Sequence, residues 1–87
     1  MEKLKEYRQE LDVIDQKMAL LFEQRMEIIT KIKNFKKANK IPIINKVREQ
    51  EIIQKNSALL KNYQIEYQTF IKNVIKISED YQNKNEL

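Results

Sequence analysis

Apolar residues recur every three or four positions between Lys3 and Lys37, and this spacing predicts one long helix. The positions in this register are Leu4, Tyr7, Leu11, Ile14, Met18, Leu21, Ile28, Ile32 and Phe35. Five heptads in one register are typical of a helix that packs along its whole length. Arg25 stands where the register calls for another apolar side chain.

Two shorter helices are predicted after this one, over Lys46–Lys61 and Gln64–Asn83. Pro42 biases the residue before it away from helix, and Asn45 is suited to cap the second helix. Asn62 can take the left-handed conformation that ends it. The apolar residues expected to face inward are Val47, Ile52, Ile53, Leu59 and Leu60, then Tyr67, Phe70, Ile71, Val74, Ile75 and Tyr81.

These elements indicate an all-α chain with one long and two shorter helices, in a single domain over residues 1–87 with a frayed tail at 84–87. A helix of about 35 residues spans roughly 50 Å, whereas a compact domain of this length has a radius of gyration of about 12 Å. We therefore expect an intertwined helical homodimer in which the long helices cover each other. The alternative is a kinked helix in a monomeric bundle, but no Pro or Gly marks a kink.

Composition narrows the chemistry further. The chain has no Cys and no His, which excludes disulfides and removes the commonest metal ligand, so we expect no metal site. Neither a membrane-spanning apolar run nor the apolar block of a signal peptide is present, so a cytoplasmic location is expected. The formal charge of +4 suits an anionic partner, although charge alone favours a lysine-rich solvated surface as the explanation.

Three cations of the long helix are candidates for binding an anion. Arg25 interrupts an apolar stripe, where a charge needs an anion, a neighbouring carboxylate or a path to solvent. Lys36 falls within about 20° of Arg25 on the same helix face, roughly 16 Å further along, although it could be an ordinary surface lysine. Arg8 lies roughly 25 Å from Arg25 in the same chain, but in an antiparallel dimer it could approach the partner's Arg25.

The shorter helices carry further polar candidates. Arg48 and Glu49 lie in the first turn of the second helix, where Glu favours the helix dipole and Arg48 could simply pair with Glu49 or Glu51. Ser78 and Gln82 lie four residues apart on one face of the third helix. They either line a cavity or mark where that helix leaves the core.

Taken in order, these residues resemble the all-helical type II chorismate mutase family over nearly the whole chain. The stretch YRQELDVIDQKMALLFEQR carries the family's Arg, Asp and Arg at Arg8, Asp15 and Arg25. Lys36 follows at the family's interval. The segment PIINKVREQE then supplies Asn45, Arg48 and Glu49, and SEDYQ supplies Ser78 and Gln82.

The resemblance implies an isomerase that converts chorismate to prephenate without a cofactor, in the biosynthesis of phenylalanine and tyrosine. It implies that Arg25, Arg48, Ser78 and the partner's Arg8 bind the two carboxylates of the substrate. Lys36 and Gln82 would donate hydrogen bonds to the breaking ether, so that Lys36, Gln82, Arg25 and Glu49 form the catalytic set. Glu49 and Asn45 would hold the ring hydroxyl.

Asn45 departs from the family, which commonly has Asp at this position. An Asn side chain still caps a helix and still hydrogen-bonds a hydroxyl, so the departure affects binding detail and not the class of reaction. Asp15 is expected to be structural, paired with a cation of a facing helix.

Two other functions fit parts of the pattern. An isochorismate pyruvate-lyase has the same helical framework and binds a similar dianion, although Glu49 and Gln82 favour the mutase. A non-enzymatic basic helical module that binds nucleic acid is the other alternative. Against it, the basic residues form no single dense patch and the aromatic residues fall on apolar stripes. We therefore expect no nucleic-acid and no membrane partner.

Overall fold

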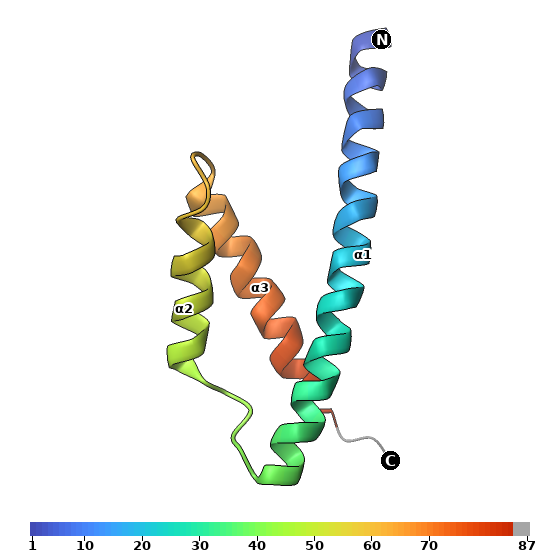
Figure 1. The fold of residues 1–87 in the computed structure, drawn as a ribbon. Helices are drawn as coiled ribbons and strands as arrows, with labels where there is room; N and C mark the ends of the chain where they lie inside the picture. The colour runs from blue at the N-terminus through green and yellow to red at the C-terminus, as the bar shows by residue number, and fades with distance from the viewer. Residues whose placement is uncertain (85–87) are drawn as a thin grey trace.

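The long helix predicted at the start of the chain forms without interruption. In the computed structural model, which describes residues 1–84, α1 runs over Glu2–Asn39, followed by α2 at Lys46–Ser57 and α3 at Gln64–Gln82 (Figure 1). The described residues contain no strand, so the prediction of an all-helical chain with one long and two shorter helices is confirmed. The tail predicted to fray lies, from residue 85 onward, outside the described residues.

The end of α1 is formed without glycine. Lys40 takes the left-handed conformation with φ 54°, and the backbone N–H of Ile41 donates to the carbonyl of Lys36 at 2.9 Å. Left-handed residues commonly end helices because this geometry satisfies the last carbonyl groups. Lys40 takes the role that is usually given to Gly, and the chain turns there toward Pro42 and α2.

Asn45 begins α2 as predicted. Its backbone is extended, and its side-chain oxygen accepts a hydrogen bond from the backbone N–H of Arg48 at 3.0 Å. This satisfies one of the N–H groups that have no partner within the helix. The cap therefore fixes where α2 starts relative to the end of α1.

The predicted end of the second helix is wrong. α2 ends at Ser57, because the N–H groups of Leu59 and Leu60 bond three residues back and tighten the chain into turns. The left-handed residue is Tyr63, with φ 66°, and not Asn62. The apolar pattern misled here because Leu59 continues the helical spacing yet is 79% exposed.

The core lies between α2 and α3. Ile53 of α2 packs with Ile71, Val74 and Ile75 of α3, and Ile52 and Tyr67 pack against this cluster. Val47 and Phe70, which were expected to face inward, are exposed in the single chain. None of the buried residues belongs to α1, so the hairpin of α2 and α3 carries the core.

The N-terminal half of α1 projects beyond the other two helices (Figure 1). Its apolar stripe is exposed throughout, at Leu4, Tyr7, Leu11, Ile14, Met18 and Leu21. The radius of gyration of 16.4 Å exceeds the value of about 12 Å expected for a compact domain of this length. Within residues 1–84, none of the helices is both long enough and apolar enough to cross a bilayer.

Candidate active site

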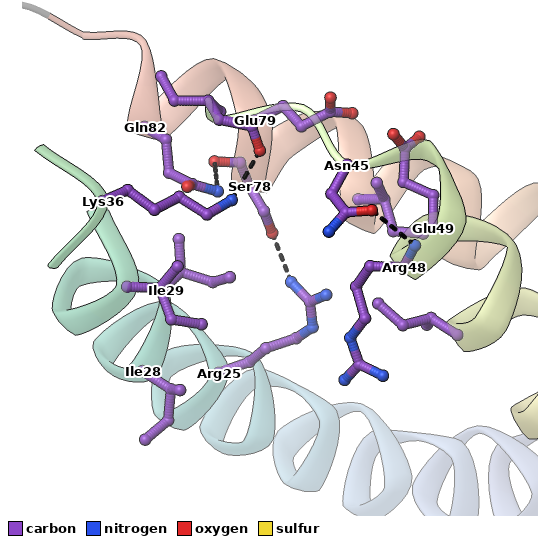
Figure 2. A pocket seen from close by; sticks show the side chains of 14 residues that line it. Arg25, Ile28, Ile29, Lys36, Asn45, Arg48, Glu49, Ser78, Glu79 and Gln82 are labelled. Atoms are coloured by element: carbon purple, nitrogen blue, oxygen red, sulfur yellow. Dashed lines mark hydrogen bonds between the residues drawn. The ribbon is translucent and has the colours of Figure 1, made fainter. Parts of the chain in front are cut away.

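A cavity of about 310 Å³ opens where the C-terminal halves of α1 and α3 face the start of α2 (Figure 2). Sites for small molecules begin at about this size. Every site residue predicted from the sequence lines the cavity except Arg8. The lining consists of Arg25, Ile28, Ile29, Ile32 and Lys36 from α1, Ile43 and Asn45 from the connection, Arg48, Glu49 and Ile52 from α2, and Ile75, Ser78, Glu79 and Gln82 from α3.

Arg25 reaches across the cavity from α1 to α3. Its guanidinium donates a hydrogen bond to the hydroxyl of Ser78, which in turn donates to the carbonyl of Val74 at 3.0 Å. Burial lowers the pKa of Arg25, the charge interaction with Tyr67 raises it by a smaller amount, and the neighbouring charge of Arg48 lowers it slightly further. Among the described residues no carboxylate forms an ion pair with Arg25. A half-buried cation that meets only a neutral hydroxyl is suited to bind an anion.

Two nitrogen donors, Lys36 and Gln82, face the cavity from α1 and α3 (Figure 2). The Nζ of Lys36 donates to the carbonyl of Ile43 at 2.7 Å, which ties it to the connection before α2. The Nε2 of Gln82 donates to the carbonyl of Ser78 at 3.2 Å. Each group retains further N–H donors, because an ammonium carries three and an amide two.

Gln82 and Glu49 each bring a buried oxygen that has no hydrogen-bond partner among the described residues. These atoms are the Oε1 of Gln82, whose side chain is only 8% exposed, and the Oε2 of Glu49. The Nζ of Lys46 lies 3.7 Å from Glu49 Oε2, close enough for an ion pair but too far for a hydrogen bond. Buried acceptors without partners are rare in folded proteins, so both atoms are candidates for contact with a ligand or water.

Arg48 lines the cavity, but its guanidinium forms an ion pair on the surface of α2. Its guanidinium donates to Glu51 at 2.6 Å, and both side chains are more than half exposed. The simple pairing within α2 considered from the sequence is therefore present. Exposed pairs of this kind contribute little stability, about 0–1 kcal/mol, so Arg48 can be recruited from it at small cost.

Glu79 and six isoleucines line the cavity, although sequence reasoning did not single them out as site residues. Their place in the cavity could have been predicted from their helical spacing relative to the site residues. Ile28, Ile29 and Ile32 follow Arg25 at intervals of three, four and seven residues, and Glu79 lies three residues before Gln82. The three isoleucines of α1 give the cavity an apolar wall on that side.

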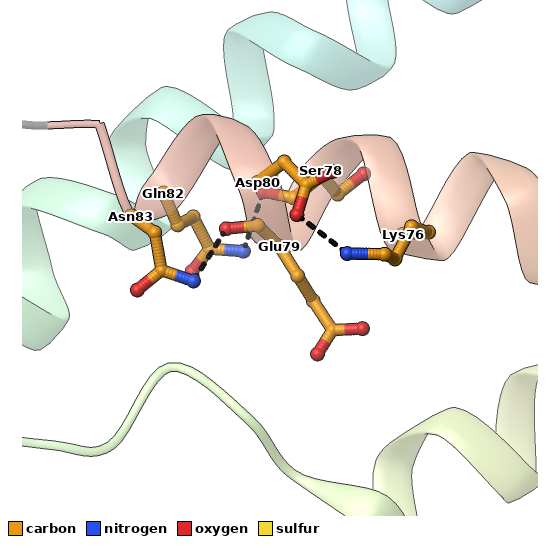
Figure 3. A network of polar contacts seen from close by, with 6 residues as sticks. All are labelled: Lys76, Ser78, Glu79, Asp80, Gln82 and Asn83. Atoms are coloured by element: carbon orange, nitrogen blue, oxygen red, sulfur yellow. Dashed lines mark hydrogen bonds and ion pairs between the residues drawn. The ribbon is translucent and has the colours of Figure 1, made fainter.

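The end of α3 is held by two sets of contacts. Tyr81 hydrogen-bonds Thr30 of α1 at 2.9 Å, and the Nζ of Lys33 lies 4.9 Å from the centre of its ring. Along α3 itself, Asn83 donates to the carbonyl of Glu79 and Lys76 pairs with Asp80 (Figure 3). The Asp80 hydrogen bond and charge raise the pKa of Lys76, which is exposed. The Tyr81 contacts set Ser78 and Gln82 opposite Arg25 and Lys36.

Arg8 and Asp15 lie on the projecting half of α1, away from the cavity. Arg8 borders a shallow surface depression with Met1, Leu4 and Asp12. Asp15 is exposed, and neither α2 nor α3 of the described chain covers this half of α1. A single chain therefore brings together all the predicted site residues except Arg8.

Comparison with known families decides the assignment. The family model of chorismate mutase type II matches residues 7–83, a range that includes every residue lining the cavity. The chain belongs to the type II chorismate mutase family. No curated protein and no solved structure matches the chain. The resemblance seen in the sequence is thus confirmed for the family, and the cavity occupies the part of the chain that the type II chorismate mutase model covers.

Proposed function

We propose that this protein is a chorismate mutase, which rearranges chorismate to prephenate in the biosynthesis of phenylalanine and tyrosine in the cytoplasm. The observation that carries the proposal is the cavity of this type II family member, which is lined by half-buried Arg25, Lys36 and Gln82. Within residues 1–84 no carboxylate is paired with Arg25. The substrate is a dianion, so this charge arrangement matches it.

The reaction is an intramolecular [3,3] rearrangement. A carbon–oxygen bond of the ether breaks while a carbon–carbon bond forms, and no proton or group leaves the molecule. The protein has two tasks: to hold the compact conformer in which the reacting atoms approach, and to stabilise negative charge on the ether oxygen.

Holding the conformer falls to the cations. Arg25 binds one carboxylate with its fork of N–H donors, and the Ser78 hydroxyl supports it. Arg48 leaves Glu51 and joins the second carboxylate. The apolar wall of isoleucines excludes water, which strengthens these contacts.

Stabilising the transition state falls to Lys36 and Gln82. Each retains an N–H beyond the one bonded to the backbone, and both face the cavity. A donor aimed at developing charge typically lowers the barrier by about 3 kcal/mol. Glu49 accepts a hydrogen bond from the ring hydroxyl through its Oε2, which has no hydrogen-bond partner among residues 1–84. Asn45 assists through its amide N–H groups, because its oxygen already caps α2.

The functional unit is proposed to be a homodimer. The exposed apolar stripe from Leu4 to Leu21 needs a cover of matching length, and a second α1 in antiparallel orientation provides one. That arrangement brings Arg8 of one chain toward the cavity of the other, where it adds a second guanidinium for the substrate carboxylates. Sedimentation analysis should give a dimer at micromolar concentration, and a monomer would contradict this part of the proposal.

The function is tested by incubating purified protein with chorismate, and separately with isochorismate, and identifying the products by NMR. Prephenate formed from chorismate without added metal or cofactor is the expected result. Pyruvate released from isochorismate, with no prephenate from chorismate, would show a lyase on the same framework. No conversion of either by folded dimer would refute both enzymatic functions.

A further inference from the structure

A second depression of about 570 Å³ adjoins the cavity at the end of α1. It shares Lys36, Ile43 and Gln82 with the cavity, so the two spaces lie next to each other. The lysines that line it are Lys33, Lys36, Lys37, Lys40 and Lys84. We call this the lysine groove. No Asp or Glu side chain of residues 1–84 lines it.

Helix electrostatics explain only part of this cluster. Lys36 and Lys37 lie in the last turn of α1, where cations complement the helix dipole. Lys40 lies beyond that helix, and Lys84 lies two residues beyond the end of α3. Two helix ends thus place their lysines around one open space, and the same space leads to the proposed ether-binding groups Lys36 and Gln82.

We propose that the lysine groove is the route by which the dianionic substrate reaches the cavity, and that Lys37 and Lys40 set the rate of its arrival. This proposal rests on the proposed function and deepens it. A cleft lined by charge of one sign focuses the electric field and raises the association rate of an oppositely charged ligand by about 10–10³-fold. Lys37 and Lys40 line the groove but not the cavity, so they act on arrival and not on the chemical step.

The test removes those two charges together. The substitutions are Lys37→Gln and Lys40→Asn, because Asn tolerates the left-handed conformation of residue 40. Two unit charges at about 10 Å from a dianion, screened as in 0.1 M salt, correspond to about a threefold fall in kcat/KM. In 0.01 M salt the fall is about sevenfold, because the Debye length is then about 30 Å and the charges are screened less. The kcat should stay unchanged.

The matched control is Lys55→Gln with Lys61→Gln, which removes the same net charge at the far end of α2. We expect this pair to lower kcat/KM by less than twofold at either salt concentration. An equal effect of both pairs would mean that only net charge matters and would overturn the groove. A fall in kcat for the groove pair would also overturn it, because these lysines would then act in the chemical step.

The outcome separates the groove from the function itself. Wild-type turnover at saturating chorismate tests the function, and the salt dependence of kcat/KM tests the groove. If wild-type protein turns nothing over, the function fails, and the comparison is made on the Kd of chorismate from calorimetry. Equal Kd values for the groove pair and the control pair would then refute the groove as well.

Discussion

Arg25 of α1 donates a hydrogen bond to the hydroxyl of Ser78 of α3, although the two residues are 53 positions apart in the chain. This contact crosses the cavity and links the wall formed by α1 to the wall formed by α3. Ser78 is 3% exposed and also donates to the carbonyl of Val74, so it does not depend on Arg25 for a partner. The contact therefore orients Arg25 more than it stabilises α3.

Replacing Arg25 should abolish catalysis and spare the fold. Arg25→Met should lower kcat/KM by about 100-fold or more, because a charge-assisted contact to a carboxylate is lost.

Burial lowers the pKa of Arg25, so its charged form is less favourable in the folded than in the unfolded chain. This penalty is fully present at neutral pH, below both pKa values, and would fade only as the pH rose through the folded pKa. Arg25→Met should therefore keep or raise the melting temperature near pH 7. A drop of several degrees in calorimetry would show that Arg25 is structural.

Lys36 should act on the chemical step. Lys36→Ala should lower kcat by about 100-fold with a smaller rise in KM, because its Nζ is proposed to donate to the charge that grows in the transition state. The adjacent Lys37→Ala is the matched control, since Lys37 does not line the cavity, and it should leave kcat unchanged. Steady-state kinetics decide between these results. A rise in KM alone for Lys36→Ala would assign the residue to substrate binding.

Gln82 offers a prediction about pH. In Gln82→Glu the introduced carboxyl can donate a hydrogen bond only when it is protonated, whereas the amide donates at every pH. The kcat of this variant should be highest at low pH and fall as the pH rises through the pKa of the carboxyl. Wild-type kcat, measured in the same buffers, should stay nearly flat over that range. A flat profile for the variant would mean that donation from residue 82 is not needed.

The cap that Asn45 forms on α2 should contribute about 1 kcal/mol to the free energy of unfolding. Asn45→Ala removes the acceptor of the Arg48 N–H and should lower the free energy of unfolding by about that amount. Asn45→Asp retains the acceptor, so its stability should match the wild type within about 0.5 kcal/mol. Urea denaturation followed by circular dichroism measures both. An equal loss in the two variants would place the role of Asn45 outside the cap.

Periodicity predicted the helices well and their ends less well. The start of α2 was predictable because Asn45 has a side chain that caps. The end of α2 was not, because Leu59 and Leu60 carry the apolar spacing past Ser57 into a turn. The left-handed residue at that turn is Tyr63. Tyrosine has no preference for the left-handed conformation, so this position was not predictable.

The site was predictable as a set of polar residues but not as a shape. The interval between Arg25 and Lys36 placed them on one helix face, and the resemblance to the family added Gln82; all three line the cavity. The outward pairing of Arg48 with Glu51 depends on a choice of rotamer, which composition does not determine. The place of Glu79 in the wall follows from how α3 is rotated, and the contacts of Tyr81 set that rotation.

The central claim is that the cavity is a chorismate mutase site completed by Arg8 of a second chain. Prephenate formation by mixed subunits tests it most directly. Arg8→Ala and Arg25→Ala dimers should each be inactive. Random mixing should restore about a quarter of wild-type activity, because half of the dimers are then hybrids that each hold one intact site. Native mass spectrometry verifies that hybrids form. Hybrids without activity, beside an active wild type, would contradict a site shared between chains.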